Sequence, residues 1–351
     1  MQKSSLQAKY FFLFALFLLF LSGCNIPQTP EPEPTISAEE ISFQETEAAA
    51  LIPTETPEPE LRKAILIAPS DTTPYLLNTI RDGFAVDSNQ NLEFIEAETL
   101  SESMLDAKTE TVVFSNSPAD IGDYAQKHPE IQFVVIGGDP QPFGNVLTIR
   151  YDPGFETFLG GYALALSATD WRGAGLIPSD VAFREETFLN GAQYFCGRCQ
   201  SVIAPYVVFP LVVSLPSSAS AEEWSSGIDQ ILSNYIYSFY ISPEAASDAL
   251  FEKFSGMEVT LLGANDMPVS LESKWLATIR IDIAGAVKEI VSAEERSVRG
   301  GEIIPELLIV PGGVGKTFHE GRKIRIEEVY QNLLSGLISA YDPVPPATFE
   351  K

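Results

Sequence analysis

Short apolar runs alternate with helix-like patterns through most of residues 61–351. Residues 64–68 and 131–136 have the character of buried strands, and residues 76–84 have that of the helix after the first strand. Apolar strands that alternate with helices are typical of parallel sheets covered on both faces. The pattern therefore predicts an α/β protein.

The strand and helix patterns fall into two series. Strands are expected at 64–68, 92–96, 111–114, 131–136, 147–150, 173–177, 206–209, 236–240, 259–262, 277–283 and 307–310, and helices at 76–84, 155–168, 186–195 and 326–340, with another helix ending near residue 291. Small residues in 155–168, among them Gly160 and Gly161, are expected to allow close helix packing. Two sheets joined by several crossings predict a two-lobed protein with a cleft. The first lobe is expected to be 61–170 plus about 275–300, and the second 171–274 plus about 301–345.

The N-terminus has the features of an export signal. Lys3 and Lys9 precede an apolar run over residues 10–21, and a helix of that length reaches only about 18 Å, short of the roughly 30 Å hydrocarbon core. The run ends in Leu-Ser-Gly before Cys24, which resembles a bacterial lipobox. The resemblance implies that 1–23 is a lipoprotein signal peptide. Diacylated Cys24 would then hold the chain to the extracytoplasmic face of a cell membrane. The alternative is a secretory signal with an incidental cysteine.

The segment after Cys24 lacks the composition of a folded domain. Residues 25–60 contain seven Pro, nine Glu and no Lys or Arg. Such a segment cannot bury enough apolar surface to offset its ordering entropy, and proline with like charge extends it. We expect residues 24–60 to be a disordered tether that holds a folded module away from the membrane.

The charge balance excludes one class of partner. The chain has 22 Lys+Arg against 48 Asp+Glu, a formal charge of −26, so it would repel a phosphate backbone and no nucleic acid is expected. Only two His and three Cys are present, which disfavours a soft-metal cluster. No Ser or Cys nucleophile stands in a recognisable elbow. The sequence predicts no cofactor, no metal site and no enzymatic activity.

Several motifs in the folded part resemble one family. Residues 128–138, Asn145-Val, residues 154–163, residues 188–192 and residues 262–266 are similar to segments of the basic membrane protein family, the PnrA-like substrate-binding lipoproteins of ABC importers. The block 128–163 is the most specific. The resemblance implies a type I periplasmic-binding-protein fold, with two doubly wound α/β lobes around a ligand cleft. It also implies a nucleoside-like ligand and an ABC permease as partner.

The loops beyond the strands hold the candidate binding residues, because ligands on parallel sheets bind past the carboxyl ends of strands. The loops after residues 68, 114 and 136 are therefore of interest. Asp71 matches the acid of the family's first loop, whereas Pro74 stands where that family has Phe and Tyr75 follows one place late. Tyr75 is a candidate for base stacking; the alternative is an ordinary helix entry capped by Asp71 or Thr72.

Four further positions complete the predicted ligand-binding set. Asn116, Asp139 and Asp266 each follow a strand, although each could equally serve a turn. Arg280 stands where the family has a lysine, and these two cations are not interchangeable at a hydrogen-bonding site. The predicted ligand-binding residues are Asp71, Tyr75, Asn116, Asp139, Asp266 and Arg280.

Two other motifs suggest chemistry. Cys196 and Cys199 form a CxxC, for which we expect a disulfide in an exported protein; free thiols, metal binding and redox catalysis are the alternatives. Residues 311–317 mimic a phosphate-binding loop, but Val310 occupies the place of its first glycine, so we expect a turn there.

The sequence thus predicts a lipid-anchored solute-binding protein of an ABC importer. A sensor of the same fold that signals to a membrane partner is the first alternative. A surface redox protein that uses Cys196 and Cys199 is the second.

Overall fold

The computed structural model describes residues 62–85, 92–292, 298–314 and 318–343. The predicted signal peptide, Cys24 and the Pro/Glu-rich tether lie outside the described residues. None of the helices in the described ranges combines the length and the apolar character needed to cross a membrane.

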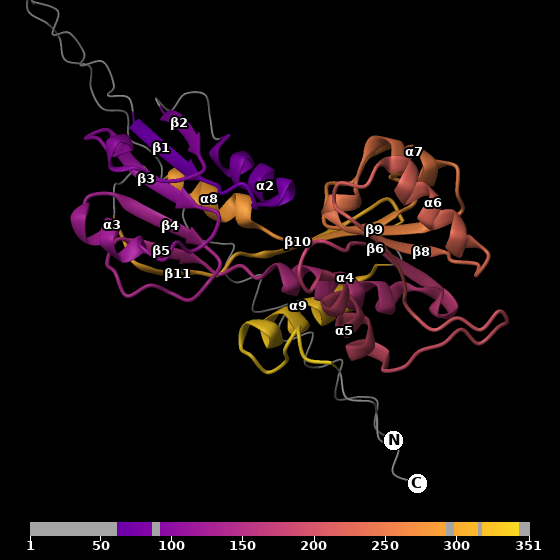
Figure 1. The fold of residues 1–351 in the computed structure, drawn as a ribbon. Coiled ribbons are helices and arrows are strands. Elements are labelled where there is room, and N and C mark those ends of the chain that lie inside the picture. The colour runs from indigo at the N-terminus through magenta and orange to yellow at the C-terminus, as the bar shows by residue number, and fades with distance from the viewer. Residues whose placement is uncertain (1–61, 86–91, 293–297, 315–317, 344–351) are drawn as a thin grey trace, which may run out of the picture. The chain divides into compact units, whose positions relative to one another are not determined.

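The first sheet has six strands, all parallel, in the order β11-β5-β4-β3-β1-β2 (Figure 1). Its strands are β1 (Arg62–Ile67), β2 (Leu92–Ala97), β3 (Thr109–Phe114), β4 (Gln132–Ile136), β5 (Val146–Ile149) and β11 (Gly301–Ile303). Helices α2 (Pro74–Phe84) and α8 (Ile283–Val291) pack together on one face, and α3 (Ile121–Lys127) covers the other. We call this sheet and its three helices the first lobe.

The alternation of side chains along β1 explains why both faces are apolar. Ala64 and Leu66 belong to the core beneath α2 and α8, whereas Ile65 and Ile67 belong to the core beneath α3. Successive strand residues point to opposite faces, so a strand buried on both sides is apolar along most of its length, as in residues 64–67 of β1. The prediction of a parallel sheet with two covered faces is confirmed for this lobe.

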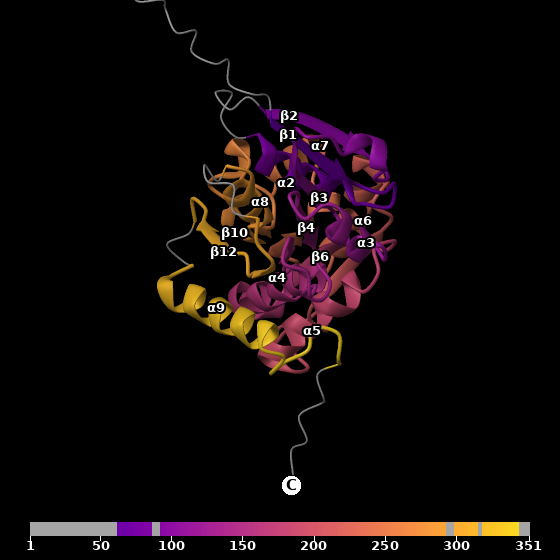
Figure 2. The same ribbon diagram turned by 90° about the vertical axis from the view of Figure 1, so that its left-hand side faces the viewer.

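The second sheet also has six strands, in the order β12-β10-β9-β8-β6-β7, and only β12 is antiparallel to its neighbour. Its strands are β6 (Gly173–Pro178), β7 (Leu211–Leu215), β8 (Ser238–Ile241), β9 (Thr260–Gly263), β10 (Trp275–Ile281) and β12 (Leu307–Pro311). Its helices are α4 (Pro153–Ser167), α5 (Arg184–Cys196), α6 (Ala221–Leu232), α7 (Asp248–Ser255) and α9 (Glu320–Leu334). Helices α6 and α7 cover one face, and α4, α5 and α9 lie on the other (Figures 1 and 2). We call this sheet and its five helices the second lobe.

Helices α4 and α5 meet at glycines. A Cβ at Gly161 would lie 2.0 Å from the carbonyl oxygen of Phe188, and one at Gly191 would lie 1.9 Å from that of Phe158. The two backbones are therefore in direct contact, which only glycine allows. The close packing expected of the small residues in 155–168 is confirmed.

The chain passes between the sheets three times, and the crossings differ from the predicted lobe boundaries. They follow β5, β10 and β11. The boundaries assigned 153–167 and 275–281 to the first lobe and 301–303 to the second. However, α4 and β10 belong to the second lobe, and β11 pairs with β5 in the first. The error arose because strand pairing is a long-range choice that apolar runs alone do not encode.

Two predicted elements lie elsewhere. A strand was expected at 206–209, but there Val208 makes only an isolated bridge with Gln200, and the true strand β7 begins after Pro210. Pro210 has no N–H for a ladder, so the apolar run pairs only beyond it. The last helix was expected at 326–340, yet α9 begins at Glu320 and ends at Leu334, where Gly336 takes a left-handed φ of 71°.

Candidate ligand-binding site

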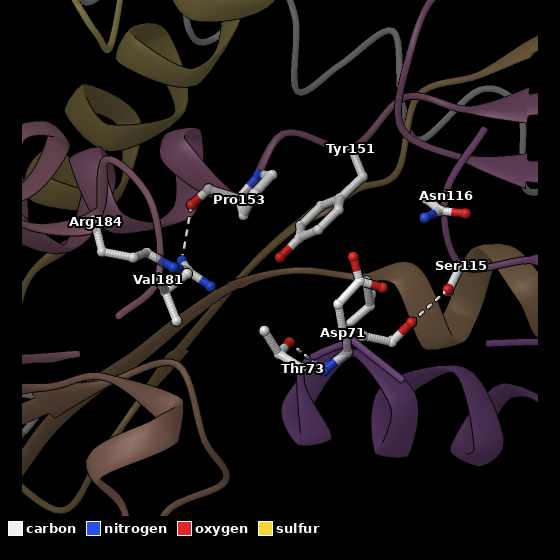
Figure 3. A pocket seen from close by; sticks show the side chains of 10 residues that line it. Asp71, Thr73, Ser115, Asn116, Tyr151, Pro153, Val181 and Arg184 are labelled. Atoms are coloured by element: carbon white, nitrogen blue, oxygen red, sulfur yellow. Dashed lines mark hydrogen bonds between the residues drawn. The ribbon is translucent and has the colours of Figure 1, made fainter. Parts of the chain in front are cut away.

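A cavity of about 180 Å³ lies where segments of both lobes meet (Figure 3). Its first-lobe wall comes from the loops after β1 and β3, and its second-lobe wall comes from the start of α4 and the loop before α5. The lining residues are Asp71, Thr72, Thr73, Leu76, Ser115, Asn116, Tyr151, Pro153, Val181 and Arg184. The cavity therefore opens at the carboxyl ends of the strands, where open α/β sheets bind ligands.

The first-lobe wall is built around the amino end of α2. Thr73 caps this helix by accepting a hydrogen bond from the Leu76 N–H (3.3 Å), and Pro74 fits its first turn. The Thr72 and Ser115 hydroxyls are hydrogen-bonded to each other at 2.8 Å, which ties the loops after β1 and β3 together. Asp71 and Asn116 beside them are exposed, so their carboxylate and amide are available to a ligand.

Arg184 supplies the second-lobe wall with a buried cation. Its guanidinium donates to the Pro153 carbonyl (2.8 Å) and to the Thr157 hydroxyl (2.5 Å), and it pairs with Glu244 (3.1 Å). The side chains of Arg184 and Glu244 are 3% and 2% exposed, so the pair is fully desolvated. The neighbouring Phe183 has a left-handed φ of 61°, which starts α5 and directs the chain into this position.

Glu156 connects the two lobes behind the cavity. The Tyr75 hydroxyl of α2 donates to Glu156 Oε1 (2.9 Å), and the Tyr151 hydroxyl donates to Oε2 (3.4 Å). Burial raises the pKa of Glu156 to about 7, although Arg184 and the Tyr75 hydrogen bond oppose the shift. The pKa of Tyr75 is also raised, by burial first and by Glu156 next. A carboxyl group that changes charge near neutral pH therefore lies between the lobes.

More polar groups are buried near the carboxyl end of β8 and the start of α5. Within the described ranges, the Tyr240 hydroxyl, the Ser242 hydroxyl, Glu244 Oε2 and Arg184 Nε have no hydrogen-bond partner in the protein. Buried polar atoms are normally satisfied by protein, ordered water or a ligand. Of these residues only Arg184 lines the cavity, and the other three lie outside its lining.

The structure brings only part of the predicted set together. Asp71 and Asn116 line the cavity, and Tyr75 stands next to it but directs its hydroxyl to Glu156. Asp139 is exposed after β4, where Gly137 and Gly138 both have positive φ, and it does not line the cavity.

Asp266 and Arg280 are occupied with each other. Arg280 Nη1 lies 2.7 Å from Asp266 Oδ1, and the aspartate side chain is 86% exposed. Neither residue lines the cavity. The turn function considered for Asp139 and Asp266 suits these positions better than ligand binding does.

The residues that the sequence analysis missed are Tyr151, Glu156, Arg184 and Glu244. Glu156 lies in the first turn of α4 and Arg184 is the first residue of α5, and charged residues at such positions are usually solvated. Glu244 follows β8, so the rule that singled out the loops of the first lobe would have found it if applied to the second. The partners of Glu156 and Arg184 lie far away in the chain, and no local pattern reveals them.

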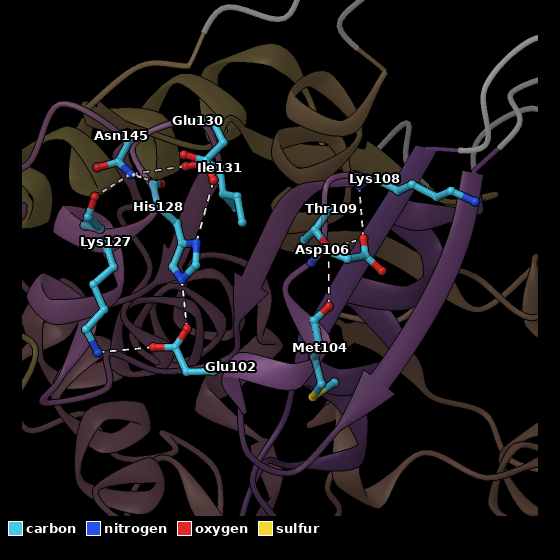
Figure 4. A network of polar contacts seen from close by, with 11 residues as sticks. Glu102, Met104, Asp106, Lys108, Thr109, Lys127, His128, Glu130, Ile131 and Asn145 are labelled. Atoms are coloured by element: carbon cyan, nitrogen blue, oxygen red, sulfur yellow. Dashed lines mark hydrogen bonds and ion pairs between the residues drawn. The ribbon is translucent and has the colours of Figure 1, made fainter.

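A separate polar cluster surrounds His128 at the edge of the first lobe (Figure 4). Glu102 accepts from Lys127 (3.1 Å) and lies 2.8 Å from His128 Nε2, and these bonds lower the pKa of Glu102. The Asn145 amide donates to three backbone carbonyls, those of Ala125, His128 and Ile131. The Asn145 contacts tie the end of α3 to the loop before β5.

The two cysteines of the CxxC motif are joined. Cys196 ends α5, and its sulfur is bonded to that of Cys199. The Phe209 N–H donates to the Cys199 carbonyl, and this hydrogen bond holds the segment before β7 beside the disulfide. No group of three or more His, Cys, Asp or Glu side chains suited to a metal occurs in the part of the chain that the structure describes.

Comparison with solved structures identifies the fold. A scan against protein-family models found no match, and a search of curated proteins also found none. The structure resembles an ABC transporter solute-binding protein from Conexibacter woesei (TM-score 0.53, 13% identity, 81% of this chain and 99% of that one). It also resembles a solute-binding protein of an ABC transporter system from Aeropyrum pernix (0.52, 15%, 80% and 93%). A third likeness is to a transcriptional activator of the comK gene from Bacillus halodurans (0.53, 12%, 79% and 99%).

These likenesses, at low identity, concern the fold alone. Together with the two parallel-dominated α/β lobes, they show that the chain has a type I periplasmic-binding-protein fold.

Proposed function

We propose that this chain is a lipid-anchored, extracytoplasmic solute-binding protein of an ABC importer and that it binds a nucleoside-like small molecule. The observation that carries the proposal is the cavity lined by the carboxyl ends of strands from both lobes. In this fold such a cavity is where hinge motion encloses a ligand. The motifs of residues 128–163 support the PnrA-like family in particular, and the lipobox-like sequence before Cys24 supports the anchor.

The cavity offers the groups that a nucleoside requires. The Tyr151 ring lies along one side and gives a face for stacking a base, while Asp71 and Asn116 give acceptors and donors for ribose hydroxyls (Figure 3). Arg184 adds a fixed cation whose charge Glu244 balances. All of these groups bind and orient a ligand. None of them forms a nucleophile–base pair, so the site suits binding rather than bond-making.

A thermal-shift panel tests the ligand. The full chain is heated with nucleosides, free bases, pentoses and unrelated metabolites. A ligand at 100 times its Kd stabilises the folded state by about 2.7 kcal/mol, which raises Tm by several degrees. We expect nucleosides to give the largest shift. If no nucleoside raises Tm at millimolar concentration, the nucleoside proposal fails. If a pentose or a base alone gives the largest shift, the ligand class is different.

Two matched variants locate the site. Asp71→Asn removes a carboxylate from the cavity wall, whereas Asp139→Asn removes an exposed carboxylate after β4 that does not line it. We expect Asp71→Asn to weaken nucleoside binding at least tenfold, about 1.4 kcal/mol, because a ligand hydroxyl loses a charged acceptor. Asp139→Asn should bind as the wild type does. Equal effects of the two variants in calorimetric titration would place the ligand elsewhere.

A further inference from the structure

The segment between α5 and β7 exposes a cluster of large apolar side chains. Val202, Ile203, Tyr206 and Val208 are 67–75% exposed, whereas Val207 and Phe209 beside them are buried. We call residues 200–208 the tip loop; it extends beyond the second sheet in Figure 1, in pink between α5 and β7. Scattered exposed apolar residues are common, but a contiguous set on one loop indicates an interaction surface.

The tip loop is held in place from beneath. The buried Arg172 guanidinium donates to the carbonyls of Ile203, Pro205 and Asn234, and the Val202 N–H donates to Asp170 (2.7 Å). The disulfide that ends at Cys199 fixes the start of the loop. The apolar side chains are thus presented by a preorganised backbone, which reduces the entropy lost when a partner covers them.

The loop lies at the end of the second sheet opposite the cavity. The Tyr237 and Ser238 N–H groups donate to the Arg172 carbonyl just before β6 and β8 begin. Arg172 also lies 5.9 Å from the ring centre of Tyr235, and Tyr235 and Tyr237 are exposed. The amino ends of the parallel strands carry this surface, and their carboxyl ends carry the cavity. A partner at the tip loop would leave the cavity accessible.

The charge of this region differs from that of the rest of residues 61–351. Residues 187–221 contain no Asp or Glu, although the chain has 48 of them, and Arg198 is their one charged residue. Asp170 at the base of the loop is paired with Arg172 (3.0 Å). Carboxylates are repelled by lipid phosphates, whereas aliphatic side chains enter the headgroup boundary and Tyr settles at that interface. A protein partner would not require this exclusion of acids.

We infer that the tip loop docks onto the surface of a lipid bilayer, with Val202, Ile203 and Tyr206 in the headgroup boundary. A single contact of this size binds weakly, so it depends on a tether that keeps the domain near the membrane, and in this respect the inference rests on the proposed lipid anchor. The segment 25–60 has 36 residues, and a chain of that length can span at most roughly 110 Å at about 3.1 Å per residue, which is enough to let the loop meet the bilayer.

Fluorescence in vesicles tests the docking. Tyr206→Trp places a reporter in the tip loop, and Val269→Trp places one at a comparably exposed site after β9, at the cavity end of the same lobe. The full chains are reconstituted into vesicles of phosphatidylcholine and phosphatidylglycerol, with and without bromine on the acyl chains. We expect blue-shifted emission and strong quenching for Tyr206→Trp and neither for Val269→Trp, after subtraction of the wild-type signal.

A third variant, together with vesicle flotation and a Tm measurement, distinguishes membrane docking by the tip loop from the effects of the anchor and of the cavity. Adding Val202→Ser and Ile203→Ser to Tyr206→Trp should remove most of the quenching without lowering Tm, because both side chains are exposed. Equal quenching of the two reporters, or none in the tip loop, overturns the inference; the second result would point to a protein partner. Flotation of the serine variant with vesicles tests the anchor on its own, because its tip loop has lost the apolar side chains proposed to dock. The nucleoside-induced Tm shift of the serine variant tests the cavity.

Discussion

At the scale of single residues, Glu156 is the most unusual group in the site. It is a buried carboxyl that accepts hydrogen bonds from a tyrosine of each neighbouring segment, Tyr75 and Tyr151. Its pKa in the folded protein is about 7, raised by burial from 4.5. The folded state therefore binds a proton more tightly than the unfolded state does. The contribution of Glu156 to stability is therefore most favourable below about pH 4.5 and is lost progressively as the pH rises through about 7.

We predict that Glu156→Gln removes this pH dependence. The shift corresponds to a cost on the order of 3 kcal/mol at neutral pH, and glutamine keeps the acceptor for Tyr75 without the charge. Urea unfolding between about pH 5 and pH 7.5 should show a smaller loss of stability in the variant than in the wild type. Glu258→Gln, at an exposed glutamate, is the control and should follow the wild type. Parallel profiles for wild type and Glu156→Gln would show that the carboxyl does not titrate in this range.

Some residues of the site could be predicted from the sequence and others could not. Asp71 and Asn116 could be predicted because each lies in the loop after a strand, and strand ends converge at one edge of a parallel sheet. Arg184 could not, because its role depends on Glu244, sixty residues later in the chain, and on the start of α4. Asp266 and Arg280 also follow or lie on strands, yet they neutralise each other on the surface.

At the scale of elements, the contact of α4 with α5 fixes the second-lobe wall of the cavity. Pro153 and Thr157 at the start of α4 accept from Arg184 at the start of α5, so the two helices must cross closely to bring these ends together. Gly161 and Gly191 allow that approach.

We predict that Gly161→Ala and Gly191→Ala destabilise the protein. In an isolated helix, alanine gains up to about 1 kcal/mol over glycine. Here the new Cβ would lie about 2 Å from a backbone carbonyl of the partner helix, so the helices must separate at a cost of about 1–3 kcal/mol or more. Chemical denaturation measures the change. Gly144→Ala, where a Cβ meets nothing within 4 Å, should stay within about 0.5 kcal/mol of wild type. A stabilised Gly161→Ala would contradict the close crossing.

Most elements could be predicted from the sequence because burial on two faces leaves long apolar runs, as in β1, β3 and β4. The incorrectly predicted elements are those in which an apolar run is not buried as one strand or helix. The run at 206–209 is divided between an exposed loop and a buried turn. Gly336 ends α9 by its backbone conformation, whereas the apolar pattern continues past it.

At the scale of the whole molecule, the largest apolar core includes residues of both sheets, for example Leu66 and Val113 of the first lobe and Ile177 and Leu262 of the second. The chain also crosses between the sheets three times. Either feature makes it costly to unfold one lobe and leave the other intact.

We predict a single unfolding transition for the folded part. All three tryptophans, Trp171, Trp224 and Trp275, lie in the second lobe, so their fluorescence reports that lobe alone. Val113→Ala creates a cavity in the first sheet and should lower the fluorescence midpoint as much as the midpoint from far-ultraviolet circular dichroism. A fluorescence midpoint that does not move, while circular dichroism shows two steps, would mean that the lobes unfold independently.

Helix α4 has a consequence for how the two ends of the second lobe communicate. Its fifteen residues span about 22 Å, and it is buried along most of its length. It begins at Pro153 and Glu156 beside the cavity, and the chain leaves it directly into Asp170 and Arg172, which hold the tip loop. A stiff helix that contacts the cavity at one end and leads to the tip loop at the other can act as a lever. A tilt imposed at the cavity end would displace the opposite end by a proportional distance, without any relay of side-chain rearrangements between them.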